Sequence, residues 1–119
     1  MSEVRYPLEP IVQDVIRCYA SGATRDAQAG KPQYAGYIGW RALIRYGEYM
    51  LKHQTGPDGQ PRAADNWKKG IPPEDYVDSL ARHMVDFFAA IERGDFEVAE
   101  EAACAIWFNS QGWLFERLR

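Results

Sequence analysis

A short stretch of the chain carries four polar side chains that could act together, Ser79, Arg82, His83 and Asp86. On a helical wheel with Ser79 at zero, they fall between about −60° and 40°. The apolar residues of the same stretch fall between about 80° and 180° and are expected to face the core: Val77, Leu80, Met84, Phe87, Phe88 and Ile91. Two interpretations stay open, a solvated face with a His–Asp pair one turn apart, or a site for chemistry.

A second acidic position precedes the most apolar stretch of the sequence. Glu101 leads into residues 102–108, which are apolar all round, and Asn109 follows them. Glu101 and Asn109 are separated by about 80° on a helix, within reach of one site. Burying an unpaired carboxylate costs roughly several kcal/mol of free energy. The cost is offset where the carboxylate is paired with a cation or bound to a metal. Alternatively, this is a helix end where Asn109 pairs with a neighbour.

Glu48 is a third candidate acid. Ile44 and Leu51 share its face at helical spacing, so we expect Glu48 to point inward. Arg41 or Arg45 could form an ion pair with Glu48, or a bound metal cation could neutralise it. Glu48, Asp86, Glu101 and Asn109 would together offer the oxygen ligands that Mg²⁺ or Mn²⁺ prefers, with His83 as a nitrogen ligand or base. Zinc is disfavoured because the chain has two histidines and no cysteine pair at ligand spacing.

The elements that would position these residues are predicted to be helices. Proline spacing, capping signals and apolar periodicity predict helices from Pro10 to about residue 20, over 37–53, from Pro73 to about residue 92, and from about 96 to 118. We therefore expect one all-α domain over 1–119, a bundle of four to five helices. Residues 1–36 would form an N-terminal helix and loop, and 37–118 the core.

The segment 55–73 is rich in Gly and Pro and is predicted to be a long loop. Loops of this length in compact domains are usually functional or disordered, and the sequence 65–70 (DNWKKG) favours function. We expect Trp67 and Asn66 to line a ligand site. The alternative is that Trp67 plugs the bundle, because Trp is commonly buried.

Net charge and composition exclude some classes of binding partner. A net charge of −3 argues against binding of duplex nucleic acid, whereas a nucleotide that brings its own metal stays compatible. No stretch has the length of a membrane span, and residues 1–10 lack an apolar signal region. Cys18 and Cys104 lie in apolar patterns and are expected to be buried thiols. We expect a cytoplasmic protein of a bacterium or a phage-infected cell, without membrane partners.

Four motifs together resemble a known family: residues 45–50 (RYGEYM), 65–72 (DNWKKGIP), 79–86 (SLARHMVD), and an acidic pair leading to 104–109 (CAIWFN). Over about 37–118 the chain is similar to the phage and bacterial dATP/dGTP diphosphohydrolase N-terminal domain, and through it to MazG-like all-α nucleoside triphosphate pyrophosphohydrolases. In that superfamily, Glu-x-x-Glu and Glu-x-x-Asp pairs hold Mg²⁺. Here the corresponding pairs read His83-x-x-Asp86 and Glu101-x-x-Cys104, so two of the four positions, His83 and Cys104, depart from a carboxylate.

The resemblance implies metal-dependent hydrolysis of purine (deoxy)nucleoside triphosphates with release of pyrophosphate. Asp86 and Glu101 would hold Mg²⁺ or Mn²⁺, and Glu48 would complete the shell or orient the water. Arg82 or Lys68 would meet phosphate, and Trp67 would stack on the base. A homodimer or homotetramer is expected, with the apolar helix around 102–108 at the interface. The alternative is a non-catalytic nucleotide-binding or protein-interaction module with a degenerate metal site.

Overall fold

The computed structural model describes residues 11–13, 16–27 and 30–119. Their contacts divide the chain into two compact units, Met1–Ile38 and Gly39–Arg119. The sequence prediction treats 1–119 as one domain with its core starting at 37, whereas the contacts separate the chain after Ile38. Within the described part, no helix is both long and apolar enough to cross a membrane. The protein is mostly helical, with one small sheet.

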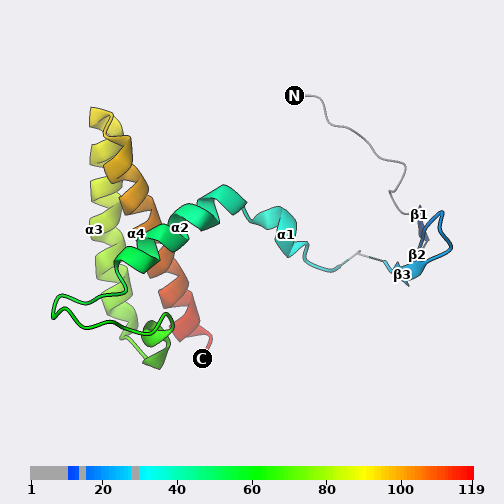
Figure 1. Ribbon diagram of the computed structural model, residues 1–119, viewed down its shortest axis with the longest axis horizontal. Helices are drawn as coiled ribbons and strands as arrows, with labels where there is room; N and C mark the ends of the chain where they lie inside the picture. The colour runs from blue at the N-terminus through cyan, green and yellow to red at the C-terminus, as the bar shows by residue number, and fades with distance from the viewer. Residues whose placement is uncertain (1–10, 14–15, 28–29) are drawn as a thin grey trace. The chain divides into compact units, whose positions relative to one another are not determined.

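The first unit contains a three-stranded antiparallel sheet in the order β1-β2-β3 (Figure 1). Its strands are β1 (Ile11–Gln13), β2 (Ile16–Cys18) and β3 (Thr24–Asp26), with Ile11 opposite Cys18 and Ile16 opposite Asp26. The side-chain Nε of Arg17 donates to the carbonyl of Asp26 at 2.7 Å. A short helix, α1 (Tyr34–Tyr37), lies near the end of this unit. It begins within the part of residues 1–36 that was predicted to be a loop.

The helix predicted from Pro10 to about residue 20 is wrong where the structure describes it; Pro10 itself lies outside the described residues. The β-branched residues of this segment lose side-chain freedom in a helix and favour strands. Ser21 and Gly22, which directly follow the predicted end of this helix, instead lie in a hairpin turn between β2 and β3. Gly22 takes a φ of 90°, its N–H donates to the Tyr19 carbonyl, and Tyr19 N–H donates to the Ala23 carbonyl. The all-α prediction therefore fails for this unit.

The second unit consists of helices and the long loop. Its elements are α2 (Trp40–Lys52), the short 3₁₀ helix η1 (Asn66–Lys69), α3 (Pro73–Arg93) and α4 (Phe96–Arg117). The predicted helices at 73–92 and 96–118 are confirmed, and α2 covers most of the predicted 37–53. Figure 1 shows α3 and α4 side by side and antiparallel, with α2 crossing them. The helical-bundle prediction holds for this unit.

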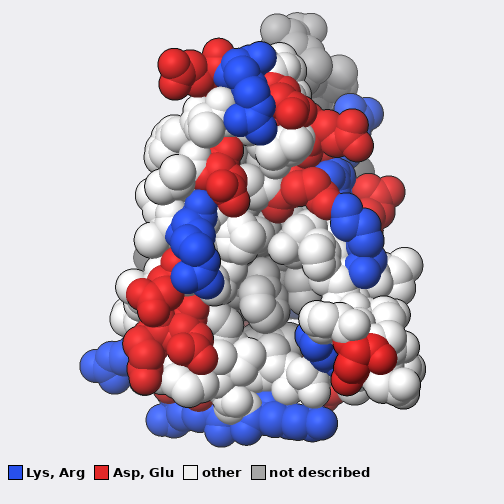
Figure 2. Space-filling model, turned by 90° about the vertical axis from the view of Figure 1, so that its left-hand side faces the viewer, with Lys and Arg blue, Asp and Glu red and all other residues white. Residues whose placement is uncertain are grey.

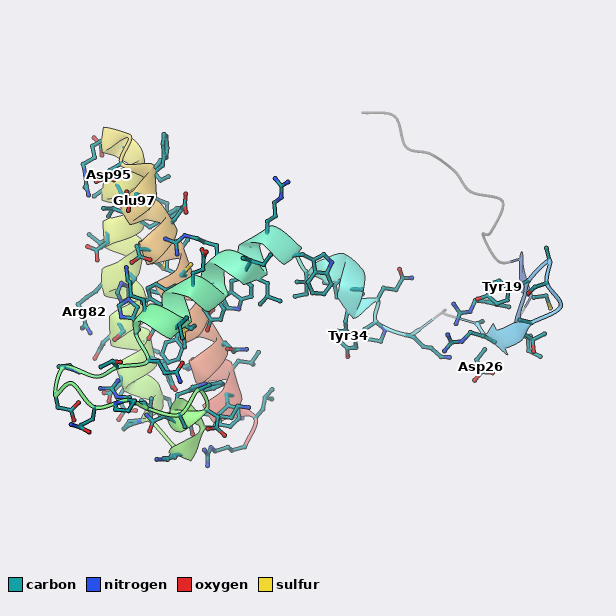
Figure 3. The ribbon with its side chains drawn as sticks, viewed as in Figure 1. Tyr19, Asp26, Tyr34, Arg82, Asp95 and Glu97 are labelled. Atoms are coloured by element: carbon teal, nitrogen blue, oxygen red, sulfur yellow. The ribbon has the colours of Figure 1, made fainter. Side chains whose placement is uncertain are left out.

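A tight turn joins α3 to α4, as their sequence indicates. Gly94 takes a left-handed φ of 75°, which a glycine adopts without steric cost, and its N–H donates to carbonyls of the last α3 turn. The Asp95 side chain then accepts a hydrogen bond from Val98 N–H and caps α4. The acids of this end, Asp95 and Glu97, are labelled in Figure 3. The turn sets the two long helices against each other.

Small residues form the contact between α3 and α4. The buried positions include Ala90, Ala99, Ala102 and Ala105, so the two backbones approach closely. At the other end, Tyr76 is only 2% exposed and its ring lies against Gly112. A Cβ at position 112 would overlap that ring, so the glycine makes room for the tyrosine. Close packing keeps α3 and α4 in register.

The core-facing side of α3 differs from the prediction. The buried or half-buried residues of α3 are Tyr76, Ser79, Leu80, His83, Phe87 and Ala90, which centre at about 50° on the wheel used above. In contrast, Val77, Met84, Phe88 and Ile91 are 41–62% exposed. The reason is that α4 is the long helix that packs along α3, and it covers the side where His83 lies. The polar arc and the packing face therefore overlap at His83.

The apolar stretch 102–108 is covered mainly within the chain. Ala102, Cys104 and Ala105 are 5%, 6% and 1% exposed, and Trp107 stacks on Tyr46 of α2 with ring centroids 4.5 Å apart. The chain itself therefore covers most of this stretch, and the homodimer or homotetramer with this stretch at its interface stays a prediction. Cys104 is a buried free thiol as predicted, whereas Cys18 is half-buried.

Candidate functional site

The end of α2, the long loop, α3 and α4 enclose a cavity of about 640 Å³, called here the large cavity. The side chains at its wall include Tyr49, His53, Arg62, Asn66, Trp67, Ser79, His83, Phe108 and Asn109. Four of the predicted site residues thus meet in one place, namely Asn66, Trp67, His83 and Asn109. Among the described residues that line this cavity there is no aspartate or glutamate.

A second hollow of about 300 Å³, the small cavity, adjoins the first. Tyr49, His53 and His83 line both cavities, so these three side chains lie at their junction. The small cavity adds Asp86, Arg93 and Glu101. The predicted acids of α3 and α4 therefore converge on one hollow, next to the cavity that holds the aromatic and amide groups.

Trp67 is placed by η1 and is half-buried. Its ring packs edge-to-face against Phe115 at 4.9 Å and Phe108 at 6.0 Å between centroids. Lys68 Nζ lies 5.7 Å from the Trp67 centroid. The loop after η1 is fixed to the end of α4, because Glu116 Oε2 accepts from Ile71 N–H at 3.2 Å. Trp67 thus both packs on the bundle and lines the large cavity.

His83 is the group common to the polar arc, the packing face and both cavities. Its side chain is 35% exposed, and Nδ1 lies 3.9 Å from Asp86 Oδ2, one turn later on α3. Asp86 is 62% exposed. The facing histidine, His53, packs on the Tyr49 ring with centroids 4.3 Å apart. A partly shielded imidazole beside a carboxylate is an arrangement that can move a proton.

Glu101 is half-buried and already compensated by two cations from α2. Its Oε2 accepts from Arg45 at 3.0 Å, and its Oε1 accepts from Lys52. These hydrogen bonds, Lys52 first, hold the pKa of Glu101 below its ordinary value of 4.5, against the opposing effect of burial. Arg45 also bonds Glu100 at 2.8 Å, and the pKa of Arg45 is raised. Sequence reasoning found no cation on the same turn as Glu101; the partners come from another helix.

Three predicted site residues line neither cavity. Lys68 lies over Trp67, and Arg82 is exposed and donates to Ser79 Oγ at 3.0 Å (Figure 3). Glu48 is exposed, and the expectation that it points inward is wrong. Its neighbours Ile44 and Leu51 are 65% and 71% exposed, because α2 meets α4 through the adjoining side, where Arg45 and Tyr46 lie.

Asn109 is 6% exposed, and its Nδ2 donates to the Ala105 carbonyl at 2.7 Å. This is the neighbour pairing that the sequence left open. It leaves the amide oxygen and a second N–H for a ligand. Tyr46, under Trp107, is the most perturbed phenol, and burial raises its pKa to about 12. That ring is packing rather than a proton donor at neutral pH.

Within the described residues, no three His, Cys, Asp or Glu side chains gather closely enough to hold a metal ion. The predicted trio of Glu48, Asp86 and Glu101 is not assembled, although Asp86 and Glu101 do face the same small cavity. Their oxygen donors suit a hard cation, and Glu101 would have to exchange the exposed Lys52 for it.

Sequence reasoning missed three side chains of the large cavity, Tyr49, His53 and Arg62. Weak signals existed: His53 is one of two histidines, and Arg62 is a lone cation between small residues and proline. On the face drawn in Figure 2, acidic and basic side chains are interspersed rather than gathered into one basic patch.

Comparison with known proteins adds no neighbour: no family model, no curated protein and no solved structure matches the chain.

Proposed function

We propose that residues 39–119 bind a purine (deoxy)nucleoside triphosphate with a divalent cation and hydrolyse it to the monophosphate and pyrophosphate. The observation that carries the proposal is the pair of adjoining cavities that meet at His83. One holds rings and amides and the other holds carboxylates, which matches the two chemical halves of a metal–nucleotide complex. The volume of about 640 Å³ lies within the usual range for small-molecule sites.

The large cavity would take the nucleoside. Trp67 offers a ring on which a base stacks, and such contacts are typically worth about 1–3 kcal/mol. The amides of Asn66 and Asn109 present donors and acceptors that can pair with the edge of a purine. Both lie on the wall with Trp67.

The small cavity would take the ion and the phosphates that the ion binds. Asp86 and Glu101 would hold Mg²⁺ or Mn²⁺, which supplies neutralisation of phosphate charge when bound. Asp86 reaches the cavity from α3 and Glu101 from α4. Arg93 lines the same hollow and can meet phosphate charge as well.

His83 would accept the proton from the attacking water. With Nδ1 turned toward Asp86 at 3.9 Å, the Nε2 side of the ring is left for that water. The separation is longer than a hydrogen bond, and catalytic hydrogen bonds are often long before the substrate is bound. Asp86 would then serve twice, orienting His83 and helping to hold the ion.

A second candidate function rests on Glu101. Because Arg45 and Lys52 already neutralise this carboxylate, the unit could bind a nucleotide without hydrolysing it. In that reading Glu101 ties α2 to α4, and no ion replaces Lys52.

The test is pyrophosphate release from dATP or dGTP with Mn²⁺, using the wild type and Asp86→Asn. Asp78→Asn, at an exposed position of the same helix outside both cavities, is the matched control. We expect turnover in the wild type and the control, and at least a tenfold loss in Asp86→Asn, in line with the loss of a proton-transfer or ion-holding group. Binding without turnover would favour the second candidate. The absence of both binding and turnover would refute both candidates.

A further inference from the structure

The loop that follows α2 is a defined hairpin. Thr55 pairs with Pro61 in an antiparallel bridge, and Arg62 N–H donates to the Gln54 carbonyl at 2.8 Å. At the tip, Gly59 N–H donates to the Gly56 carbonyl at 2.9 Å, and Gly59 takes a left-handed φ of 77°. The chain therefore returns to the end of α2 at Arg62 and holds that residue at the wall of the large cavity.

Gly56 makes room for the Arg62 side chain. Its backbone is buried, and a Cβ built there would lie 2.9 Å from Arg62 Cζ, closer than carbon atoms pack. The guanidinium thus lies against the hairpin next to the Asp58 carboxylate, whose Oδ1 would lie 2.9 Å from the same Cβ, and the residue as a whole is exposed. Within the described part of the chain, Arg62 makes no ion pair with Asp58 or another carboxylate. Asp58 Oδ1 instead accepts from Gln60 N–H at 3.0 Å, so the Arg62 guanidinium keeps donors for a ligand.

Arg62 is the one formally charged side chain among the described residues that line the large cavity, and His53 and His83 lie on the same wall. None of these lining residues is acidic. This contrasts with the whole chain, whose net charge is −3. An arginine in a hollow without acidic lining residues favours an anionic ligand, and an arginine fork suits the oxygens of a phosphate.

We propose that Arg62, with His53, binds a phosphate group of the ligand directly in the large cavity, without a metal ion. The inference rests on the proposed function in taking the ligand to be a nucleotide. It adds that binding and hydrolysis have different requirements. The nucleotide is held by Arg62 and His53, whereas His83, the carboxylates and the ion serve the reaction.

The experiment is calorimetric titration of the full chain with dATP and with deoxyadenosine, in EDTA, for the wild type, Arg62→Gln, Arg41→Gln and Gly56→Ala. Arg41 is the matched control because it is an exposed arginine outside both cavities. In EDTA the wild type should bind dATP at least about tenfold more tightly than deoxyadenosine. Arg62→Gln should lose about tenfold in dATP affinity and keep its deoxyadenosine affinity, as expected for one charge-assisted hydrogen bond.

Gly56→Ala keeps the arginine but pushes its guanidinium aside, so it should also weaken dATP binding while the melting temperature changes little. Arg41→Gln should behave as the wild type. Binding of dATP that requires Mn²⁺, or equal dATP affinity of Arg62→Gln and wild type, would overturn the inference and leave the proposed function standing. If the wild type binds neither compound, with or without Mn²⁺, the proposed function fails and the inference fails with it.

Discussion

Replacing Glu101 with glutamine should destabilise the second unit by loosening α2 from α4. Glu101 is 29% exposed and bonds both Arg45, at 3.0 Å, and Lys52. Partly exposed charge-assisted bonds of this kind contribute about 0.5–1 kcal/mol each, so we expect a loss of about 1–2 kcal/mol. For a unit of this size, each kcal/mol lowers the melting temperature by roughly 4–8 °C.

The effect should depend on pH in a defined direction. Because the pKa of Glu101 is lowered on folding, its carboxylate stabilises the folded state fully above the ordinary pKa of 4.5. That contribution is lost as the pH falls through the lowered pKa of the folded state. The wild type and Glu101→Gln should therefore differ at neutral pH and converge as the pH falls below the folded-state pKa of Glu101.

Urea unfolding followed by circular dichroism measures this difference, with Glu92→Gln on the exposed end of α3 as the control. The control should stay within about 0.5 kcal/mol of the wild type, as exposed substitutions usually do. A Glu101→Gln variant as stable as the wild type at neutral pH, or a difference that persists unchanged in acid, would refute the reasoning.

The remaining predictions concern packing, the ring of the site and assembly. Gly112→Ala should lower the free energy of unfolding by about 1–3 kcal/mol, because the added Cβ would overlap the Tyr76 ring. A urea unfolding midpoint equal to that of the wild type would contradict this. Tyr76→Phe should cost nothing, since the buried Tyr76 hydroxyl has no partner among the described residues, and a clear loss of stability would reveal one. Trp67→Ala should weaken dATP binding by about 1–3 kcal/mol; unchanged affinity with a lower melting temperature would show that the ring only packs. Light scattering at micromolar concentration should give a dimer that covers the exposed face of α3 around Phe88, and a stable monomer would contradict it.

The parts of the fold that local signals determine were predictable. Pro73 at the start of α3, and Arg93-Gly94 before a capping Asp95, fix both long helices within a few residues. The N-terminal segment was not, because Ile11 and Val12 suit a strand as well as an apolar helix face. The buried side of α3 was predicted wrongly because a helical wheel does not show which side of α3 the packing helix α4 covers.

The site was predictable as far as single positions reveal it. Trp67 and His83 stand out by residue type and both reach the large cavity. The cations of Glu101 lie 49 and 56 residues away along the chain, and no local pattern links them to it. Arg62 depends likewise on a hairpin whose closure is set by backbone hydrogen bonds. Long-range pairing is the part that a single sequence does not carry.

The most direct measurement of the central claim is a crystal structure with Mn²⁺ and a dATP analogue that resists cleavage between the α- and β-phosphates. The account predicts the purine in the large cavity against Trp67, a phosphate near Arg62, and the ion beside Asp86 in the small cavity. A nucleotide bound elsewhere on the unit, or both cavities empty at saturating ligand, would contradict it.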